Sequence, residues 1–244
     1  MKNIKLTLEY DGTNYSGWQR QTNSMTIQQK IEEAIFKLTK EKADLIGSSR
    51  TDSGVHARGF VANFKTNSTI PGEKFREALT SKLPDDIVII KSEEVDENFH
   101  SRYSSTGKTY CYTILNRKIP SAINRNYSYF YRGKLDIEAM KDACKHFIGK
   151  HDFKGFKSLG SSVKTSVRTI TELYIIKQDD YINVYISADG FLYNMVRIIV
   201  GTLIFVGTGK IKESEIPNII NSGDRRKAGK CVPPTGLFLE KVFY

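Results

Sequence analysis

One carboxylate that could take part in a reaction, that of Asp52, lies in a predicted tight turn. The turn is within residues 50–57, which read RTDSGVHA. Two arginines, Arg50 and Arg58, flank this acid, and an apolar, strand-like run at residues 60–64 follows it. Asp and Gly are ordinary turn residues, because Asp bonds to its own backbone and Gly tolerates positive φ. A buried strand after the turn would instead place the acid at the end of a sheet, facing a cleft. Asp52 is therefore either a turn residue or a reactive acid aimed at an anionic partner.

An isolated arginine gives an independent indication. Arg197 is the only charged residue between Asp189 and Lys210. It lies in a predicted helix that is apolar on nearly every side, and such a helix is buried. A guanidinium there is costly unless a carboxylate or other acceptors satisfy it. One interpretation is that Arg197 reaches the surface or pairs with a structural acid. The other is that it lies under a reactive carboxylate and keeps that acid ionised, as a nucleophile requires.

Tyr110 lies in a run at residues 108–114, KTYCYTI, whose alternation places Tyr110, Tyr112 and Ile114 on one face of a strand. A core tyrosine is the simpler interpretation. The functional alternative is a platform on which an unstacked base packs. Nearby basic residues either contact phosphates or form a solvated face: Arg102, Lys108, Arg117, Lys154, Lys157, Lys164 and Arg168.

The segment at residues 10–21 is a loop with two glycines and the only tryptophan, Trp18. It is either a hairpin packed on the core or a loop that contacts a nucleic acid. The sequence alone favours neither interpretation.

The composition fits a folded protein with a polyanionic partner. The chain has 244 residues, 39% of them hydrophobic, so it can bury a substantial core. Lys and Arg number 37 against 27 for Asp and Glu, which gives a net charge of +10 spread along the chain. Such an excess suggests a polyanionic partner such as a nucleic acid. The alternative is that this protein is basic but has no nucleic-acid role.

Other classes of protein are disfavoured. The three cysteines are far apart and the four histidines lack ligand spacing, so neither a disulfide framework nor a metal site is expected. The first residues alternate like a strand rather than a signal peptide. The most apolar stretch, residues 191–206, is interrupted by Arg197 and is shorter than the roughly 20 residues that span a bilayer. We therefore predict a cytoplasmic protein without metal or membrane attachment.

The elements that must position these residues fall into two groups. Residues 1–104 show strand signals near 4–10, 45, 60–64 and 87–90, and helix signals at 27–38, behind a capping box at Thr26 and Gln29, and after Pro71. This is the β-α-β-β-α-β order of a ferredoxin-like fold.

Residues 105–244 repeat a similar order in elaborated form, and the polar segment 101–108 marks the boundary. Strands are expected near 110–115, 127–131, 168–176, 181–188 and 237–243, and helices near 137–147, 191–206 and 216–220. We predict an α+β protein of two ferredoxin-like or RRM-like domains, 1–104 and 105–244, each with a mainly antiparallel sheet flanked by helices.

Seven motifs follow one another along the chain, at residues 9–12 with 17–21, 26–28, 50–57, 99–102 leading to Tyr110, 167–170, 191–201 and 233–237. In this order they resemble the TruA family of tRNA pseudouridine synthases. One such match would be weak, whereas seven in sequence are specific.

The resemblance implies roles for four residues. Asp52 would be the catalytic aspartate, acting as nucleophile or base, and Arg197 the arginine that pairs with it. Tyr110 would pack on the target base, and Arg50 would help displace the target nucleotide. The N-terminal domain would carry Asp52, and the C-terminal domain Tyr110 and Arg197. The family also implies a homodimer that isomerises uridines 38, 39 and 40 of the tRNA anticodon stem-loop without metal or cofactor.

The chain departs from the family's usual residues at five positions. Ser49 replaces Gly, Ser53 replaces Ala, Phe60 replaces Gln, Asn63 replaces His, and Gly155 replaces Ser. These departures bear on substrate detail more than on catalysis. Two alternatives stay open: an RNA-binding protein without activity, and the same chemistry on another RNA, such as ribosomal RNA.

Overall fold

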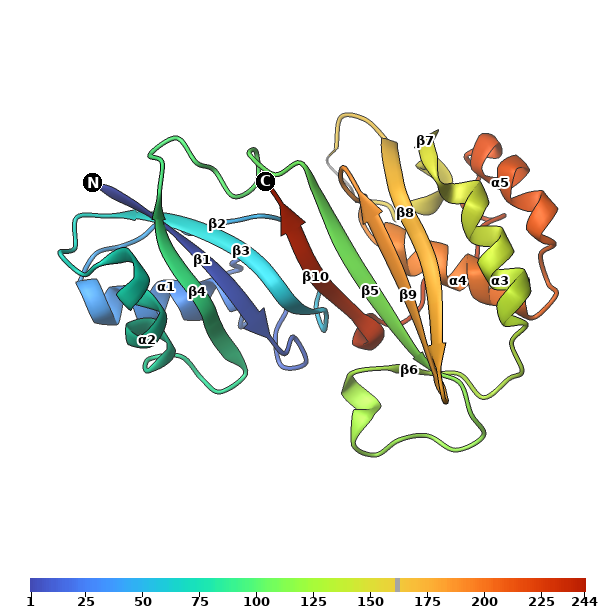
Figure 1. Cartoon of the computed structure of the whole chain (residues 1–244), viewed down its shortest axis with the longest axis horizontal. Coiled ribbons are helices and arrows are strands. Elements are labelled where there is room, and N and C mark those ends of the chain that lie inside the picture. The colour runs from blue at the N-terminus through green and yellow to red at the C-terminus, as the bar shows by residue number, and fades with distance from the viewer. Residues whose placement is uncertain (161–162) are drawn as a thin grey trace. The chain divides into compact units, whose positions relative to one another are not determined.

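The computed structural model describes residues 1–160 and 163–244, which form two compact units (Figure 1). Unit 1 comprises Met1–Thr106 together with Phe238–Tyr244, and unit 2 comprises Gly107–Leu237. The boundary predicted after residue 104 lies close to the break after Thr106. The last strand, predicted as part of the C-terminal domain, clusters instead with unit 1.

The sheet of unit 1 is built around β3 (His56–Thr66). β1 (Lys2–Tyr10) pairs antiparallel with β3 on one side and with β4 (Ile87–Val95) on the other. The remaining edge of β3 is shared: the short β2 (Ile46–Gly47) pairs antiparallel near one end, and β10 (Leu237–Phe243) pairs parallel near the other. The order β4-β1-β3-β2 is the ferredoxin-like arrangement that the sequence predicts.

The helix α1 (Ile27–Thr39) begins where the sequence places its cap. The hydroxyl of Thr26 accepts a hydrogen bond from the Gln29 N–H at 3.4 Å. The Gln29 side chain donates to Glu33 at 2.9 Å instead of returning to the cap, so only half of the predicted capping box forms. The helix ends at Lys40, whose left-handed φ of 64° stops the chain from continuing.

The second helix of unit 1, α2 (Phe75–Thr80), follows a 3₁₀ turn at Gly72–Lys74. Figure 1 shows α1 and α2 together on one side of the strands. Apolar side chains of both helices are fully buried, and they form the core with those of the strands: Ile31, Ile35, Phe75, Leu79, Ile4, Leu6, Leu8 and Phe64.

The strands of unit 2 follow the order β5-β9-β8-β7, with all neighbours antiparallel. The strands are β5 (Gly107–Leu115), β9 (Tyr181–Ala188), β8 (Val167–Gln178) and β7 (Gly149–Asp152). The two-residue β6 (Tyr129–Phe130) pairs parallel with β5 and is shorter than predicted. The sequence did not predict β7, because the residues GKHD carry no apolar signal.

The helices of unit 2 are α3 (Ile137–Cys144), α4 (Met195–Gly207) and α5 (Ile216–Ser222). Figure 1 shows them on one side of the strands of this unit. As predicted for a helix without a polar face, α4 buries 11 of its 13 residues. Each unit is thus a mainly antiparallel sheet flanked by helices, which confirms the α+β class.

Candidate active site

Asp52 occupies the first position of a closed turn directly before β3. The Val55 N–H donates to the Asp52 carbonyl at 3.1 Å. Gly54, at the third position, has a φ of 76°, which a glycine adopts without strain. The Asp52 side chain is half-buried. The turn interpretation of this motif is therefore correct for the backbone, and it defines how the acid is presented.

A second loop, residues 11–20 after β1, is hydrogen-bonded to this turn. We call it the β1 loop. The Tyr15 carbonyl accepts hydrogen bonds from the Ser53 hydroxyl at 3.1 Å and from the Gly54 N–H at 3.3 Å. The Trp18 N–H donates to the Thr51 carbonyl at 3.1 Å. The residues on both sides of Asp52 are thus bonded to one neighbouring loop.

Two glycines of the β1 loop make this close approach possible. A Cβ on Gly12 would lie 2.0 Å from the Val55 carbonyl oxygen, and one on Gly17 would lie 2.3 Å from that of Thr51. Either distance is a severe clash with backbone. Trp18 packs inward, stacked on Phe60 at a centroid distance of 4.0 Å. The β1 loop therefore packs on the core and the Asp52 turn, one of the two possibilities left open by the sequence.

His56, the first residue of β3, is a support that sequence reasoning missed. Its ring is 1% exposed and stacks on Phe238 of β10 at 4.7 Å. Its Nδ1 accepts the Gly12 N–H at 3.1 Å and lies 3.1 Å from the Asp11 carboxylate. The ring therefore joins the β1 loop, β3 and β10. Its place inside the Asp52 motif was the only signal available.

Arg50, the first residue of the motif, has an exposed side chain. It makes no ion pair with any residue that the structure describes. Its guanidinium is therefore available to a partner, while Thr51 and the turn behind it are fixed.

Tyr110 lies on β5, with 6% of its surface exposed. Its ring meets the Phe191 ring edge-on, at 5.1 Å and 86°. Tyr112, two residues on, is completely buried, and its hydroxyl donates to the Pro233 carbonyl at 2.7 Å. Burial raises the pKa of the Tyr112 phenol, and the nearby Arg197 charge partly opposes that rise. Tyr112 therefore belongs to the core, close to Arg197.

Arg197, in the first turn of α4, is half-buried and held by acceptors inside unit 2. Its Nε donates to the Val232 carbonyl at 2.7 Å, and its Nη1 donates to the Asn194 side-chain oxygen at 2.6 Å. Asn194 has a left-handed φ of 61° and donates to the Ser158 hydroxyl at 2.9 Å. These contacts fix the direction of the guanidinium on a buried helix.

Asn63, on β3, is the centre of a buried polar network in unit 1. Its side-chain oxygen accepts from the Ser101 N–H at 2.8 Å and the Ser101 hydroxyl at 2.6 Å. Its amide donates to Asn3 at 3.0 Å, and the Tyr244 hydroxyl donates to the Ser101 carbonyl at 2.8 Å. The network attaches the motif at residues 99–102 to β1, β3 and the end of the chain.

The four predicted residues divide between the units. Arg50 and Asp52 lie together at one turn of unit 1, and Tyr110 and Arg197 belong to unit 2. Among the described residues there is no group of three His, Cys, Asp or Glu side chains that could hold a metal ion. Within the same residues, every helix is too short or too polar to cross a membrane.

Cys144 is unsuited to act as a nucleophile. Cys144 is buried in α3, and its thiol donates to the Met140 carbonyl at 3.3 Å. Burial raises the pKa of this thiol to about 12, so it stays protonated at neutral pH.

The chain is similar over its full length to curated proteins of one family. A family model described as tRNA pseudouridine synthase matches residues 7–104 and 143–244. Over the full length of both chains, the protein is 66% identical to tRNA pseudouridine synthase A 2 of Clostridium perfringens. It is 57% identical to tRNA pseudouridine synthase A of Clostridium acetobutylicum, again over the full length of both. Among solved structures, the archaeal box H/ACA sRNP Nop10-Cbf5 complex aligns with a TM-score of 0.43 and 10% identity, covering 84% of this chain and 44% of that one.

The family match places the protein in a class of isomerases that act on tRNA. Within that class, the chain belongs to the TruA family of tRNA pseudouridine synthases. The resemblance seen in the seven motifs is thereby confirmed.

Proposed function

We propose that this protein converts uridine to pseudouridine at positions 38, 39 and 40 of the tRNA anticodon stem-loop, with Asp52 as the catalytic aspartate. The reaction breaks the N1–C1′ bond, turns the uracil and joins C5 to C1′. The C5 hydrogen leaves as a proton, and N1 takes up a proton in its place. Substrate and product are isomers, so the chemistry consumes no cofactor. Ionised Asp52 acts at the ribose as nucleophile or as base.

The observation that carries the proposal is the construction of the Asp52 turn. Backbone hydrogen bonds from the β1 loop reach the residues on either side of the acid, and two glycines allow that contact. A turn that only reverses the chain does not need a second loop to fix it. A catalytic group does, because a small displacement from the reacting atom is costly in rate.

Arg50 supports the base-flipping step. A uridine must leave its stack before a side chain can reach its sugar, which costs a few kcal/mol. An exposed arginine beside a fixed acid is suited to enter the vacated space and to contact phosphates. In this proposal, Arg50 holds the helix open while Asp52 acts.

Tyr110 and Arg197 complete the site from the C-terminal domain. We assign to Arg197 the pairing with Asp52 that keeps the carboxylate ionised and fixes its rotamer. Tyr110 stacks on the flipped uracil. The fixed guanidinium and the ring set edge-on against Phe191 support these roles, as do the family motifs that contain both residues. The active form is a cytoplasmic homodimer.

The test is the substitution Asp52→Asn, with Asp44→Asn as the matched control on an exposed acid of the same unit. Tritium release from C5-labelled uridine in tRNA transcripts measures the reaction. We expect Asp52→Asn to lose about 10³-fold or more of the rate and the control to keep it. Unchanged release by Asp52→Asn contradicts the assignment. Mapping of pseudouridine in tRNA and ribosomal RNA from cells that lack the gene identifies the sites.

An RNA-binding protein without catalytic activity would give a different result. A pure RNA-binding protein shifts tRNA in a gel with normal affinity and releases no tritium, even as the wild type. Measuring binding and release on the same preparation separates this alternative from a failed catalytic assignment.

A further inference from the structure

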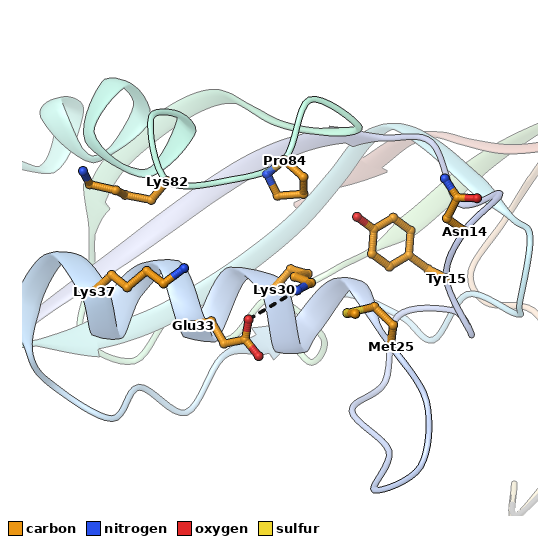
Figure 2. A pocket seen from close by; sticks show the side chains of 8 residues that line it. All are labelled: Asn14, Tyr15, Met25, Lys30, Glu33, Lys37, Lys82 and Pro84. Carbon is orange, nitrogen blue, oxygen red and sulfur yellow. Dashed lines mark ion pairs between the residues drawn. The ribbon is translucent and has the colours of Figure 1, made fainter.

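A pocket of about 330 Å³ lies in unit 1, and none of the residues assigned to catalysis lines it (Figure 2). α1 forms one wall, the connection before β4 forms another, and the β1 loop with Met25 closes one end. Neither the reaction nor the family motifs account for it.

The pocket is strongly basic. Three lysines line it, Lys30, Lys37 and Lys82, against one carboxylate, Glu33. The Glu33 carboxylate lies 3.5 Å from the Lys30 ammonium and so balances one of the three charges. A hydrogen bond from Gln29 and the neighbouring lysines lower the pKa of Glu33, which keeps it ionised. Two positive charges therefore remain uncompensated inside the pocket.

Lys37 and Lys82 supply those two charges from opposite walls. Lys37 comes from α1, one helical turn beyond Glu33, and Lys82 from the segment between α2 and β4, as Figure 2 shows. Neither forms an ion pair with a residue that the structure describes. Two ammonium groups without an ion-pair partner among the described residues, on opposite walls of one pocket, suit a ligand with a compact negative charge, such as a phosphate.

The rest of the lining suits the remainder of a nucleotide. Met25 is 46% exposed, and Pro84 is exposed as well, so both offer apolar surface beside the lysines. The Tyr15 ring is fixed in the wall, because its hydroxyl donates to Asp86 at 2.6 Å. Apolar and aromatic surface next to cations is the combination that binds a ribose or base together with its phosphate.

One residue connects this pocket to the Asp52 turn. Tyr15 lines the pocket with its side chain, and its carbonyl accepts hydrogen bonds from Ser53 and Gly54. The pocket therefore adjoins the loop that fixes the Asp52 turn, and a polynucleotide bound at that turn has further phosphates along its chain.

We propose that this pocket binds a backbone phosphate of the RNA substrate between Lys37 and Lys82, with the attached ribose or base against Met25 and Pro84. The inference rests on the proposed function in one respect, that the substrate is tRNA. It adds a binding site that lies outside the catalytic residues and acts on affinity alone.

The test compares the double variant Lys37→Gln, Lys82→Gln with the double variant Lys42→Gln, Lys65→Gln. The control lysines are exposed in the same unit and lie outside the pocket. Their substitution removes the same total charge as the pocket variant does. The dissociation constant for tRNA transcripts is measured by filter binding at several salt concentrations. We expect the pocket variant to bind about tenfold more weakly, and the slope of log K against log salt to fall by about 1.5 to 2. The control should lose little of either.

Catalysis provides a second readout. At saturating enzyme, the single-turnover rate of tritium release should be the same for the pocket variant and the wild type, because the lysines do not touch the reacting atoms. A wild-type affinity and salt slope in the pocket variant overturn the proposal. Equal losses in the pocket and control variants overturn it too, because they show an effect of net charge alone.

A further experiment distinguishes a free phosphate or nucleotide from RNA as the ligand of the pocket. Thermal unfolding is followed with and without inorganic phosphate or uridine monophosphate. If either ligand stabilises the wild type but not the pocket variant, and tRNA binding is unchanged, the site serves a small molecule and the RNA assignment is wrong. Failure of the proposed function is separate, since it appears as a wild type that binds tRNA but forms no pseudouridine.

Discussion

The Asp52 turn of unit 1 and the Arg197 site of unit 2 are fixed by different kinds of contact. The turn is held through backbone groups, with two glycines that bring a second loop within hydrogen-bonding distance. Arg197 is held through its own side chain, by the Val232 carbonyl and the Asn194 amide. The backbone contact between the β1 loop and the turn leaves almost no room for an added atom. The orientation of Arg197 depends instead on which hydrogen-bond acceptors its side chain meets. The two regions should therefore respond differently to substitution.

The largest effect is expected at Gly17. Gly17→Ala places a methyl group 2.3 Å from the Thr51 carbonyl oxygen at a φ of 86°. We expect it to lower the free energy of unfolding by about 3 kcal/mol or more, and to reduce the rate of pseudouridine formation in the protein that still folds. Denaturant unfolding and tritium release measure the two effects.

Gly209 provides the matched control, because its φ is 72° and no atom lies within 4 Å of an added Cβ. Gly209→Ala should cost about 1 to 2 kcal/mol from backbone strain alone. Equal costs at the two glycines would show that close approach of the β1 loop contributes nothing to the turn.

A buried side-chain network should give the next largest effect. Asn63→Ala leaves Asn3 and Ser101 without their shared partner inside the core of unit 1. We expect a loss of about 2 to 3 kcal/mol in the free energy of unfolding. Asn67→Ala, at an exposed residue just after the same strand, should change it by less than about 0.5 kcal/mol. Similar values for both variants would mean that the network is not structurally important.

At Arg197 the effect should appear in turnover rather than in stability. Asn194→Gly keeps the left-handed backbone without strain but removes the oxygen that accepts from Nη1. We expect turnover to fall about tenfold with an unchanged KM, and the stability to change by less than about 1 kcal/mol. Asn194→Asp restores an acceptor and should recover most of the rate. A rate that is lost equally in both variants would rule out orientation of Arg197 as the cause.

The smallest effect is expected at Tyr112. Tyr112→Phe removes the hydrogen bond to Pro233 and should cost about 1 kcal/mol at neutral pH. Burial raises the pKa of this phenol in the folded state, so its neutral form stabilises the fold fully below about pH 10 and less as the pH rises further. The variant should therefore lose less stability than the wild type between pH 9 and pH 11. A parallel pH dependence in the two proteins would contradict this.

Elements with a strong local pattern were predicted well from the sequence. α1 has a cap and a helical apolar spacing, and α4 is apolar throughout, so both lie close to where they were expected. β7 escaped prediction because none of its four residues is apolar. The last strand was expected as a strand, but its pairing with β3 is a contact between distant parts of the chain, and local pattern carries no information about it.

The candidate site shows the same division. The sequence proposed Asp52, Arg50, Tyr110 and Arg197 as site residues, the last of them because it is a solitary charge in an apolar helix. It did not identify what holds them. The roles of Gly12, Gly17 and His56 depend on which loop packs against which turn, and that of Asn63 depends on a partner 38 residues away.

The position of β10 bears on how the protein is made. This strand pairs with the start of β3, stacks Phe238 on His56 and ends in the Tyr244 bond to Ser101, yet all of unit 2 precedes it in the sequence. During synthesis, the N-terminal residues leave the ribosome first and can begin to fold. The strand that completes their sheet is synthesised only after all of unit 2. The Asp52 motif is thus synthesised early, whereas the strand that supports it is synthesised after unit 2. A nascent chain that stops before β10 contains Asp52 without that support.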